Sequence, residues 1–204
     1  MYRFAVRQAQ PLVARRSHLS FARAFHLSPR CFVEVGDAVP DIELREDSPG
    51  NKVSIAKEAA KGKGLIIGVP AAFSPSCSET HVPGYINFKD LKNAGKVFVV
   101  AVNDPFVTKA WGATLDPAGK SGVSQSLGRL SLNTHLVQVR FLADPHGEFT
   151  KALDLDFDAT AIFGQPRSKR YVLVIENGKV KETHVEPDNT GVNVSAVEKV
   201  LGRK

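Results

Sequence analysis

The residue most able to do chemistry in this sequence is Cys77, which lies in a polar loop at residues 68–85, GVPAAFSPSCSETHVPGY. Residues 76–79 read Ser-Cys-Ser-Glu and fit a capping box, with Ser76 as the N-cap and Glu79 three positions later. Cys77 is then the first residue of a helix. Because backbone N–H groups there lack intrahelical partners and the helix N-terminus carries partial positive charge, this position favours a thiolate over a thiol. The pattern predicts a nucleophilic, redox-active cysteine.

The alternative is that Cys77 is an inert structural residue, because free cysteines are among the most buried residue types. Its neighbours argue against this. Ser74, three residues upstream, can hydrogen-bond the sulfur, while Pro70 and Pro75 stiffen a polar loop that is a poor place for an apolar side chain. We therefore expect a functional cysteine.

The spacing Pro70-x-x-x-Ser74-x-x-Cys77 resembles the active-site pattern of the peroxiredoxins. Residues 68–81 resemble their type-5 branch, which includes peroxisomal membrane protein and fungal alkyl hydroperoxide reductase forms. The likeness extends over about residues 35–201. It includes the motifs VNDPFV (102–107), WG (111–112), LADP (142–145), SKRY (168–171) and VEPD (185–188).

The resemblance implies a thiol-specific peroxidase that reduces hydrogen peroxide and organic hydroperoxides to water and alcohols through a sulfenic acid on Cys77, in antioxidant defence and redox homeostasis. By the same resemblance, Ser74 hydrogen-bonds peroxide and sulfur, Pro70 shields the pocket and Arg170 completes it. Ser74 stands where the family more often has threonine. Since the hydroxyl is retained, we expect the chemistry to be retained.

Elementary chemistry asks for the same residue types. Thiolate attack on a peroxide O–O bond needs an anionic sulfur, a site that holds both oxygens in line, and a group that stabilises the charge developing on the leaving oxygen. A guanidinium keeps its proton and presents donors in a fixed fork, so Arg170 can favour the thiolate and bind peroxide oxygen together. Without the resemblance, Arg170 is equally well a surface cation of a basic segment that also holds Arg167 and Lys169.

We expect no bound cofactor and no metal. The sequence Cys77-x-x-Thr80 lacks the second cysteine of a disulfide reductase, the six histidines form no metal-ligand set, and no glycine-rich phosphate loop is present. Oxidised Cys77 then needs an external thiol, either glutathione with glutaredoxin or thioredoxin. A redox-regulated chaperone or peroxide sensor uses the same cysteine and stays open as an alternative. His81 could orient the sulfur or simply pack, and the resemblance suggests a homodimer.

Strand and helix patterns alternate along residues 33–204, which indicates a parallel-rich α/β core. The set is similar to a thioredoxin-like fold: a single domain with a central mixed β-sheet flanked by helices. Asn177-Gly178 is a strong hairpin signal. The predicted strands are 41–44, 64–69, 96–102, 139–143, 170–176 and 179–184, and the predicted helices are 54–61, 77–93, one from 103 through Trp111, 147–153 and 193–201.

Residues 1–32 differ in composition from the rest of the chain, because they hold six arginines, no lysine and no acidic residue. This composition is typical of a mitochondrial transit peptide and predicts a matrix protein; a basic nucleic-acid-binding arm is the alternative. Without these arginines the 27 basic residues fall to 21, which equals the 21 acidic residues. The neutral remainder, of a size that suits one domain, gives no support for nucleic-acid or membrane partners.

The second cysteine, Cys31, decides whether the protein has one working thiol or two. Arg23 and the octapeptide 25–32 resemble a two-step mitochondrial processing pattern, which would discard Cys31 and start the mature chain at Val33. The enzyme then depends on an external thiol. If Cys31 is retained, it could resolve the sulfenic acid, as an N-terminal cysteine does in certain fungal relatives. By the same resemblance to the type-5 branch, Val194 occupies the place where a C-terminal resolving cysteine can lie, so that route is closed.

Residues 115–138 are longer and richer in glycine and serine than the resemblance leads us to expect. We interpret most of this stretch as an insertion on a surface loop. A position over the active-site mouth or at a dimer contact is the alternative.

Overall fold

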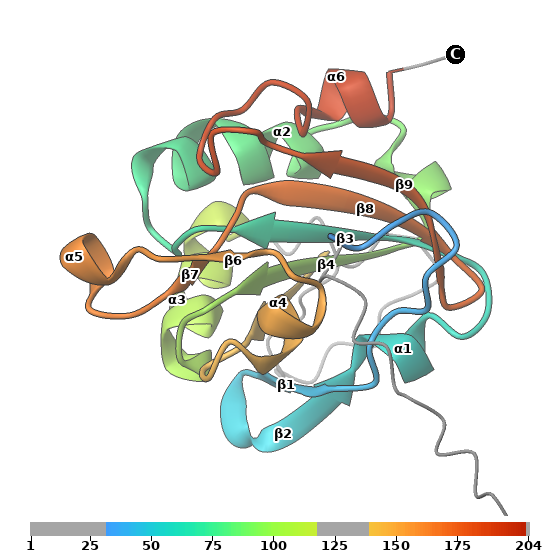
Figure 1. Ribbon diagram of the computed structural model, residues 1–204. Helices are drawn as coiled ribbons and strands as arrows, with labels where there is room; N and C mark the ends of the chain where they lie inside the picture. The colour runs from blue at the N-terminus through green and yellow to red at the C-terminus, as the bar shows by residue number, and fades with distance from the viewer. Residues whose placement is uncertain (1–31, 118–138, 203–204) are drawn as a thin grey trace, which may run out of the picture.

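The computed structural model describes residues 32–117 and 139–202, and its centre is a seven-stranded mixed sheet (Figure 1). The strand order is β2-β1-β5-β4-β3-β8-β9; β4 is parallel to β3 and to β5, and the other neighbours are antiparallel. Strands β6 and β7 form a separate antiparallel pair. The strands are β1 Glu43–Glu46, β2 Ser48–Ser54, β3 Lys63–Val69, β4 Lys96–Ala101, β5 Val139–Ala143, β6 Asp156–Phe157, β7 Arg167–Ser168, β8 Tyr171–Glu176 and β9 Lys179–Val185.

Helices cover both faces of this sheet. On one face, Ile55 of α1 and Phe149 of α4 are buried in one core cluster. On the other, Cys77, Tyr85 and Trp111 are buried in a second cluster with residues of α6. The helices are α1 Ile55–Glu58, the π-helix η1 Ser76–His81, α2 Val82–Ile86, the 3-10 helix η2 Leu91–Ala94, α3 Pro105–Leu115, α4 Glu148–Ala152, α5 Thr160–Phe163 and α6 Val197–Val200. Within the described ranges, no helix has the length and apolar character needed to cross a bilayer.

The central strands send alternate side chains to opposite faces of the sheet, as a pleated backbone requires. In β3, Leu65 and Ile67 pack in the cluster that holds Cys77, whereas Ile66 packs in the other cluster with Phe98 of β4. Both faces are buried, so β3 and β4 are nearly continuous apolar runs. The central mixed sheet flanked by helices is the predicted fold class, which is confirmed.

The six predicted strands are confirmed, each within two residues of its expected bounds, and the β8–β9 hairpin turns at Asn177-Gly178. The prediction missed β2, whose sequence SPGNKVS contains turn-forming residues. Since β2 is an edge strand, Pro49 and Gly50 do not interrupt hydrogen bonding to a second neighbour. Residues 1–31 and most of the 115–138 insertion lie outside the described residues.

Four predicted helices are shorter than expected: 54–61 is reduced to α1 and 147–153 to α4, and the other two differ more. The helix predicted over 77–93 ends at Ile86, because the Asn87 side chain donates to the Pro83 carbonyl at 2.9 Å and the chain turns there. The helix predicted over 193–201 is reduced to α6. The residues before α6 form a turn, in which the Asn193 and Ser195 N–H groups donate to the carboxylate of Glu186.

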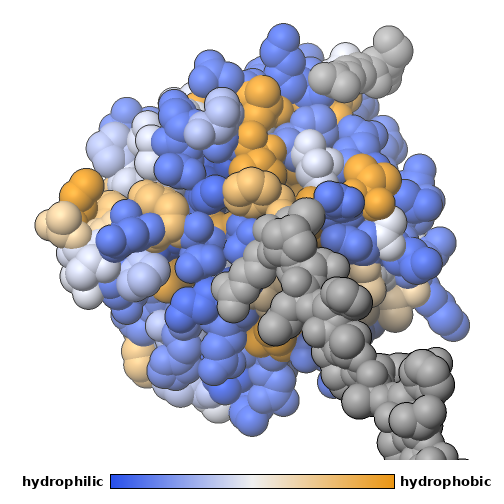
Figure 2. All heavy atoms as spheres, in the orientation of Figure 1, coloured by the Kyte–Doolittle hydropathy of each residue, from blue (hydrophilic) through white to orange (hydrophobic). Residues whose placement is uncertain are grey.

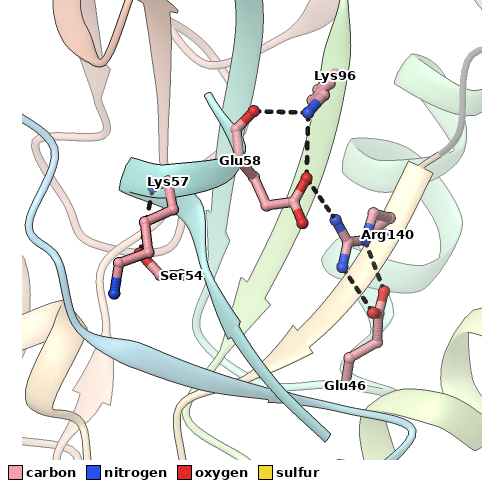
Figure 3. A network of polar contacts seen from close by, with 6 residues as sticks. All are labelled: Glu46, Ser54, Lys57, Glu58, Lys96 and Arg140. Atoms are coloured by element: carbon pink, nitrogen blue, oxygen red, sulfur yellow. Dashed lines mark hydrogen bonds and ion pairs between the residues drawn. The ribbon is translucent and has the colours of Figure 1, made fainter. Parts of the chain in front are cut away.

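A charged network joins the sheet to α1 near the amino ends of the parallel strands (Figure 3). Arg140 of β5 donates twice to Glu46 of β1, at 2.8 and 2.7 Å, and its Nη1 lies 3.4 Å from Glu58 of α1. Lys96 of β4 also reaches the Glu58 carboxylate, at 3.1 Å. The loop that carries Cys77 follows the opposite, carboxyl end of β3, so this network and the cysteine lie at opposite ends of the parallel strands.

Candidate active site

Cys77 is fully buried, with 0% of its surface exposed, in the helical segment that follows the loop from β3. The predicted capping box is wrong: Pro75 occupies the N-cap position in place of Ser76, and no side chain caps this helix end. The Ser78 N–H reaches back to the Ser74 carbonyl at 2.9 Å, so the helical turn begins earlier than expected. Cys77 is still in the first turn, where the partial positive charge of the helix N-terminus acts.

Ser74 places its hydroxyl against the sulfur. Its Oγ lies 2.8 Å from Cys77 Sγ and 3.0 Å from the carbonyl oxygen of Ala71. A hydroxyl has one proton to donate, so it bonds either the sulfur or the carbonyl at a given moment. Because an anionic acceptor is the stronger one, rotation of this hydroxyl toward the sulfur accompanies formation of the thiolate.

Arg170 places a positive charge against the same sulfur. It directly precedes β8, is 1% exposed, and its Nη1 lies 3.4 Å from Cys77 Sγ. Its Nε donates to the Thr190 carbonyl at 3.0 Å, and its backbone N–H donates to the Asn189 carbonyl at 2.8 Å. None of the ion pairs formed among the described residues involves Arg170. Its charge is therefore held by neutral acceptors.

The loop between β3 and Cys77 is fixed at its base and strained near its end. Pro70 is buried directly after β3, at the root of the loop. Unlike Ser74, it has no hydrogen-bond donor to offer the sulfur. Asn103, after β4, accepts the Ala72 N–H at 3.1 Å. Phe73 has a φ of 62°, in the left-handed region that bulky residues rarely adopt, which costs about 1–3 kcal/mol.

His81 and Tyr85 extend the site. The sequence left the role of His81 open and gave no sign of a role for Tyr85. Spacing of four residues places Cys77, His81 and Tyr85 on one buried helix face. His81 Nδ1 lies 3.1 Å from Arg170 Nη1, and His81 Nε2 lies 3.2 Å from the Ser195 carbonyl, which also accepts the Tyr85 hydroxyl at 2.7 Å. Burial, and then the charge of Arg170, lower the pKa of His81 to about 3, so the ring is neutral.

Glu186 is a buried carboxylate that sequence reasoning also missed, although it belongs to the VEPD motif. Its Oε1 accepts the backbone N–H groups of Asn193 and Ser195 at 2.6 and 2.9 Å, and the Ser195 hydroxyl at 2.7 Å. These bonds close the turn that carries Ser195 onto the helix of Cys77. The sequence signal that could have indicated Glu186 is an acidic residue directly before a Pro-Asp turn. The residues that donate to Glu186 lie seven and nine positions further along the chain.

Trp111 of α3 covers the other side of the cysteine helix. Its Nε1 donates to the Ser78 hydroxyl at 2.9 Å, and its ring packs edge-to-face on Phe141 with centroids 5.5 Å apart. No group of three or more His, Cys, Asp or Glu side chains that could hold a metal occurs in the described ranges. What remains is a buried sulfur faced by one hydroxyl and one guanidinium. Such a group can attack an electrophilic oxygen and stabilise the charge that leaves.

Comparison with known proteins gives the same reading. Residues 34–201 match the Redoxin family model. The chain is 44% identical over 172 residues to the peroxisomal membrane associated protein 20 of Schizosaccharomyces pombe, covering 83% of this chain and 97% of the relative. It is 38% identical over 176 residues to peroxiredoxin-2D of Arabidopsis thaliana, covering 83% and 96%.

Solved structures agree. Peroxiredoxin 5 from Alvinella pompejana superimposes with a TM-score of 0.65 at 33% identity, covering 84% of this chain and 99% of the other. Reduced Prx3 in complex with hydrogen peroxide, from Vibrio vulnificus, superimposes with a TM-score of 0.68 at 31% identity and the same coverage. The predicted thioredoxin-like single domain is confirmed by these neighbours.

The predicted mitochondrial location is wrong. The finding that overturns it is the S. pombe relative, which is named for the peroxisomal membrane. The prediction depended on the arginine-rich, acid-free composition of residues 1–32 alone. An arginine-rich, acid-poor composition is a compositional signal only, and by itself it does not assign a protein to a compartment. The proposed removal of Cys31 by mitochondrial processing loses its basis with it.

Proposed function

We propose a reaction for this chain on the premise that it belongs to the redoxin family and is a peroxiredoxin of the type-5 kind, a thiol-dependent peroxidase. The Cys77 thiolate attacks one oxygen of a hydroperoxide, a sulfur–oxygen bond forms and the O–O bond breaks. The leaving oxygen takes a proton and departs as water or an alcohol, and Cys77 is left as a sulfenic acid. Hydrogen peroxide and organic hydroperoxides are the substrates.

One observation carries this proposal: two donors from distant parts of the chain, Ser74 Oγ and Arg170 Nη1, lie 2.8 and 3.4 Å from the sulfur of Cys77. Arg170 favours the anionic sulfur and stabilises charge on the leaving oxygen. Ser74 donates to the sulfur or to bound peroxide. Pro70, at the root of the loop, keeps polar backbone groups and water away from the sulfur.

The sulfenic acid is then resolved by an external thiol. A thiol of glutathione, glutaredoxin or thioredoxin attacks the sulfur, water leaves, and a mixed disulfide forms; a second thiol releases Cys77. Within the described ranges Cys77 is the one free cysteine, which supports a partner thiol. Cys31 lies outside those ranges and is the competing source of a resolving thiol.

We also propose a homodimer, in the peroxisome or cytosol. The exposed large apolar side chains include Phe73 beside Ser74, Phe106 at the start of α3, and Ile162 and Phe163 in α5. Apolar spheres stand out in Figure 2 at the edge where α5 projects in Figure 1. Burial of such side chains against a second copy removes them from water. Light scattering on the protein as it leaves a size-exclusion column measures the mass of the assembly.

The test of the proposed function is peroxide consumption by the full chain with glutathione plus glutaredoxin and with thioredoxin plus its reductase. We expect continuous turnover with one of these systems and none for Cys77→Ser. Cys31→Ser keeps its turnover if the external thiol resolves the sulfenic acid. Loss of turnover in Cys31→Ser, with a Cys31–Cys77 disulfide in the unmodified chain, contradicts external resolution. Oxidation by one peroxide equivalent without turnover in any system contradicts the peroxidase itself.

A further inference from the structure

Arg170 Nη1 is shared between two acceptors, and His81 is one of them. This nitrogen lies 3.4 Å from Cys77 Sγ and 3.1 Å from His81 Nδ1. A guanidinium nitrogen only donates, so His81 Nδ1 must accept. The ring proton is therefore on Nε2, which donates to the Ser195 carbonyl at 3.2 Å. The donation runs in one direction, from Arg170 through His81 to Ser195.

The Ser195 carbonyl, at the end of this chain of bonds, is held in place from two other directions. The Tyr85 hydroxyl donates to it at 2.7 Å. The backbone N–H and the hydroxyl of Ser195 both donate to Glu186 Oε1, and Glu186 is 1% exposed. His81 is thus fixed at its Nε2 side by a segment that is itself fixed.

His81 supports Arg170 without cancelling its charge. Burial and the neighbouring guanidinium lower the pKa of His81 to about 3, so the ring is a neutral acceptor at neutral pH. A carboxylate at this place accepts a stronger hydrogen bond, but its negative charge offsets the positive charge that acts on the sulfur. A neutral ring gives Nη1 a direction and leaves the full charge of Arg170 available to Cys77.

We propose that His81 is a positioning residue, which turns Nη1 of Arg170 toward Cys77 by accepting its other N–H. The inference rests on the proposed peroxidase function and deepens it, because His81 acts through Arg170. The shared nitrogen, the one possible tautomer and the anchored carbonyl carry it. In a merely structural role, His81 would fill space between the helix and the Ser195 turn, and any side chain of similar volume that kept the Ser195 bond would serve.

Two variants separate the two nitrogens of the ring. In His81→Asn, the amide oxygen takes the place of Nδ1 and can accept from Arg170, but the donor to Ser195 is lost. In His81→Gln, the amide nitrogen takes the place of Nε2 and can donate to Ser195, but the acceptor for Arg170 is lost. Each variant is measured for its rate constant with hydrogen peroxide, for the pH midpoint of its thiolate absorbance, and for its melting temperature.

We expect His81→Gln to react at least tenfold more slowly than the unmodified chain, with its thiolate midpoint at higher pH. His81→Asn should stay within about threefold of the unmodified rate constant and keep its midpoint, since the acceptor is retained. Equal losses in both variants, or a larger loss in His81→Asn, overturn the positioning role. The same replacement at exposed His146, His146→Gln, should change none of the three measurements.

A third variant, His81→Asp, keeps the acceptor but adds a negative charge. We expect its rate constant to fall by tenfold or more relative to His81→Asn, with a higher thiolate midpoint. A rate constant equal to that of His81→Asn shows that the charge of the acceptor does not matter and contradicts the proposal. The thiolate titration needs no peroxide, so it tests His81 even if the protein fails to reduce peroxides. Failure of the peroxidase assay is thereby distinguished from failure of this inference.

Discussion

Two arginines close to the core, Arg140 and Arg170, are held in opposite ways. Arg140 is paired with the carboxylates of Glu46 and Glu58, and the Glu46 hydrogen bonds are the main cause that raises the pKa of Arg140. Arg170 is held by the Thr190 carbonyl and the His81 ring, both neutral, and by the sulfur of Cys77.

This difference separates an arginine that stabilises the fold from one that is available for chemistry. The charge of Arg140 is neutralised by its carboxylate partners. The network therefore holds β1, β5 and α1 together and has little electrostatic effect on other residues. Charge on Arg170 has no carboxylate partner among the described residues, so it acts on the sulfur. Arg170 is the more deeply buried of the two, but the charge of their partners is what separates their roles.

The largest expected effect is that of Arg170→Met, which keeps the apolar stem and removes the charge. We expect the rate constant with hydrogen peroxide to fall about 10²–10³-fold, as for loss of one donor to a developing oxyanion. The pH midpoint of the thiolate absorbance should also rise. Stopped-flow mixing and thiolate absorbance measure the two effects. An unchanged thiolate midpoint in this variant removes Arg170 from the site.

The matched change at the other arginine, Arg140→Met, should affect stability and leave the chemistry alone. Loss of its bonds leaves Glu46, whose side chain is 17% exposed, without its partner, and we expect the free energy of unfolding to fall by about 2 kcal/mol. The peroxide rate constant should stay within about twofold. Adding Glu46→Gln should recover part of the stability, because the unpaired charge is removed. A slow peroxide reaction in Arg140→Met breaks the comparison.

A third expected effect concerns acid. The pKa of His81 is about 3 in the folded chain against 6.5 for a free histidine, so between these values only the unfolded chain binds this proton. Stability is full above pH 6.5 and falls as pH drops toward 3, by about 1.4 kcal/mol per pH unit from this group. Glu58 has a lowered pKa, mainly through its Lys96 hydrogen bond, so its share is lost only below its ordinary value of 4.5.

Urea unfolding between pH 7 and 4 separates these two windows. In His81→Asn the slope between pH 6.5 and 5 should flatten, because asparagine does not titrate, while the loss below pH 4.5 should remain. A slope unchanged by the replacement shows that the folded chain protonates His81 normally.

Much of the fold could be predicted from the sequence because its central strands are buried on both faces. β3 and β4 are continuous apolar runs bounded by glycine or polar residues. The β8–β9 turn is Asn177-Gly178, a pair typical of tight hairpin turns. The edge strand β2 escaped prediction because its pairing, not its composition, makes it a strand. A local sequence pattern predicts a strand well where consecutive side chains are buried. It predicts poorly an edge strand that forms by pairing with one neighbouring strand.

The candidate site divides in the same manner. Cys77, Ser74 and Pro70 are close in sequence, so their spacing indicated a reactive loop. The partners of Arg170 come from His81 and from the turn that Glu186 closes, and these contacts exist only after the sheet has brought distant segments together. The capping box failed for a related reason: the helix starts through the Ser74 carbonyl, so Ser76 is not needed as a cap.

Trp111 gives the molecule an optical property that follows from its hydrogen bond to the cysteine helix. It is the only tryptophan in the sequence, and its indole N–H is bonded to the hydroxyl of Ser78, the residue after Cys77. An added oxygen on the sulfur, or any unwinding of η1 that admits a partner thiol, changes the surroundings of that indole. Emission from this one fluorophore can therefore time the oxidised, mixed-disulfide and reduced forms in sequence, without a label and without altering the chain.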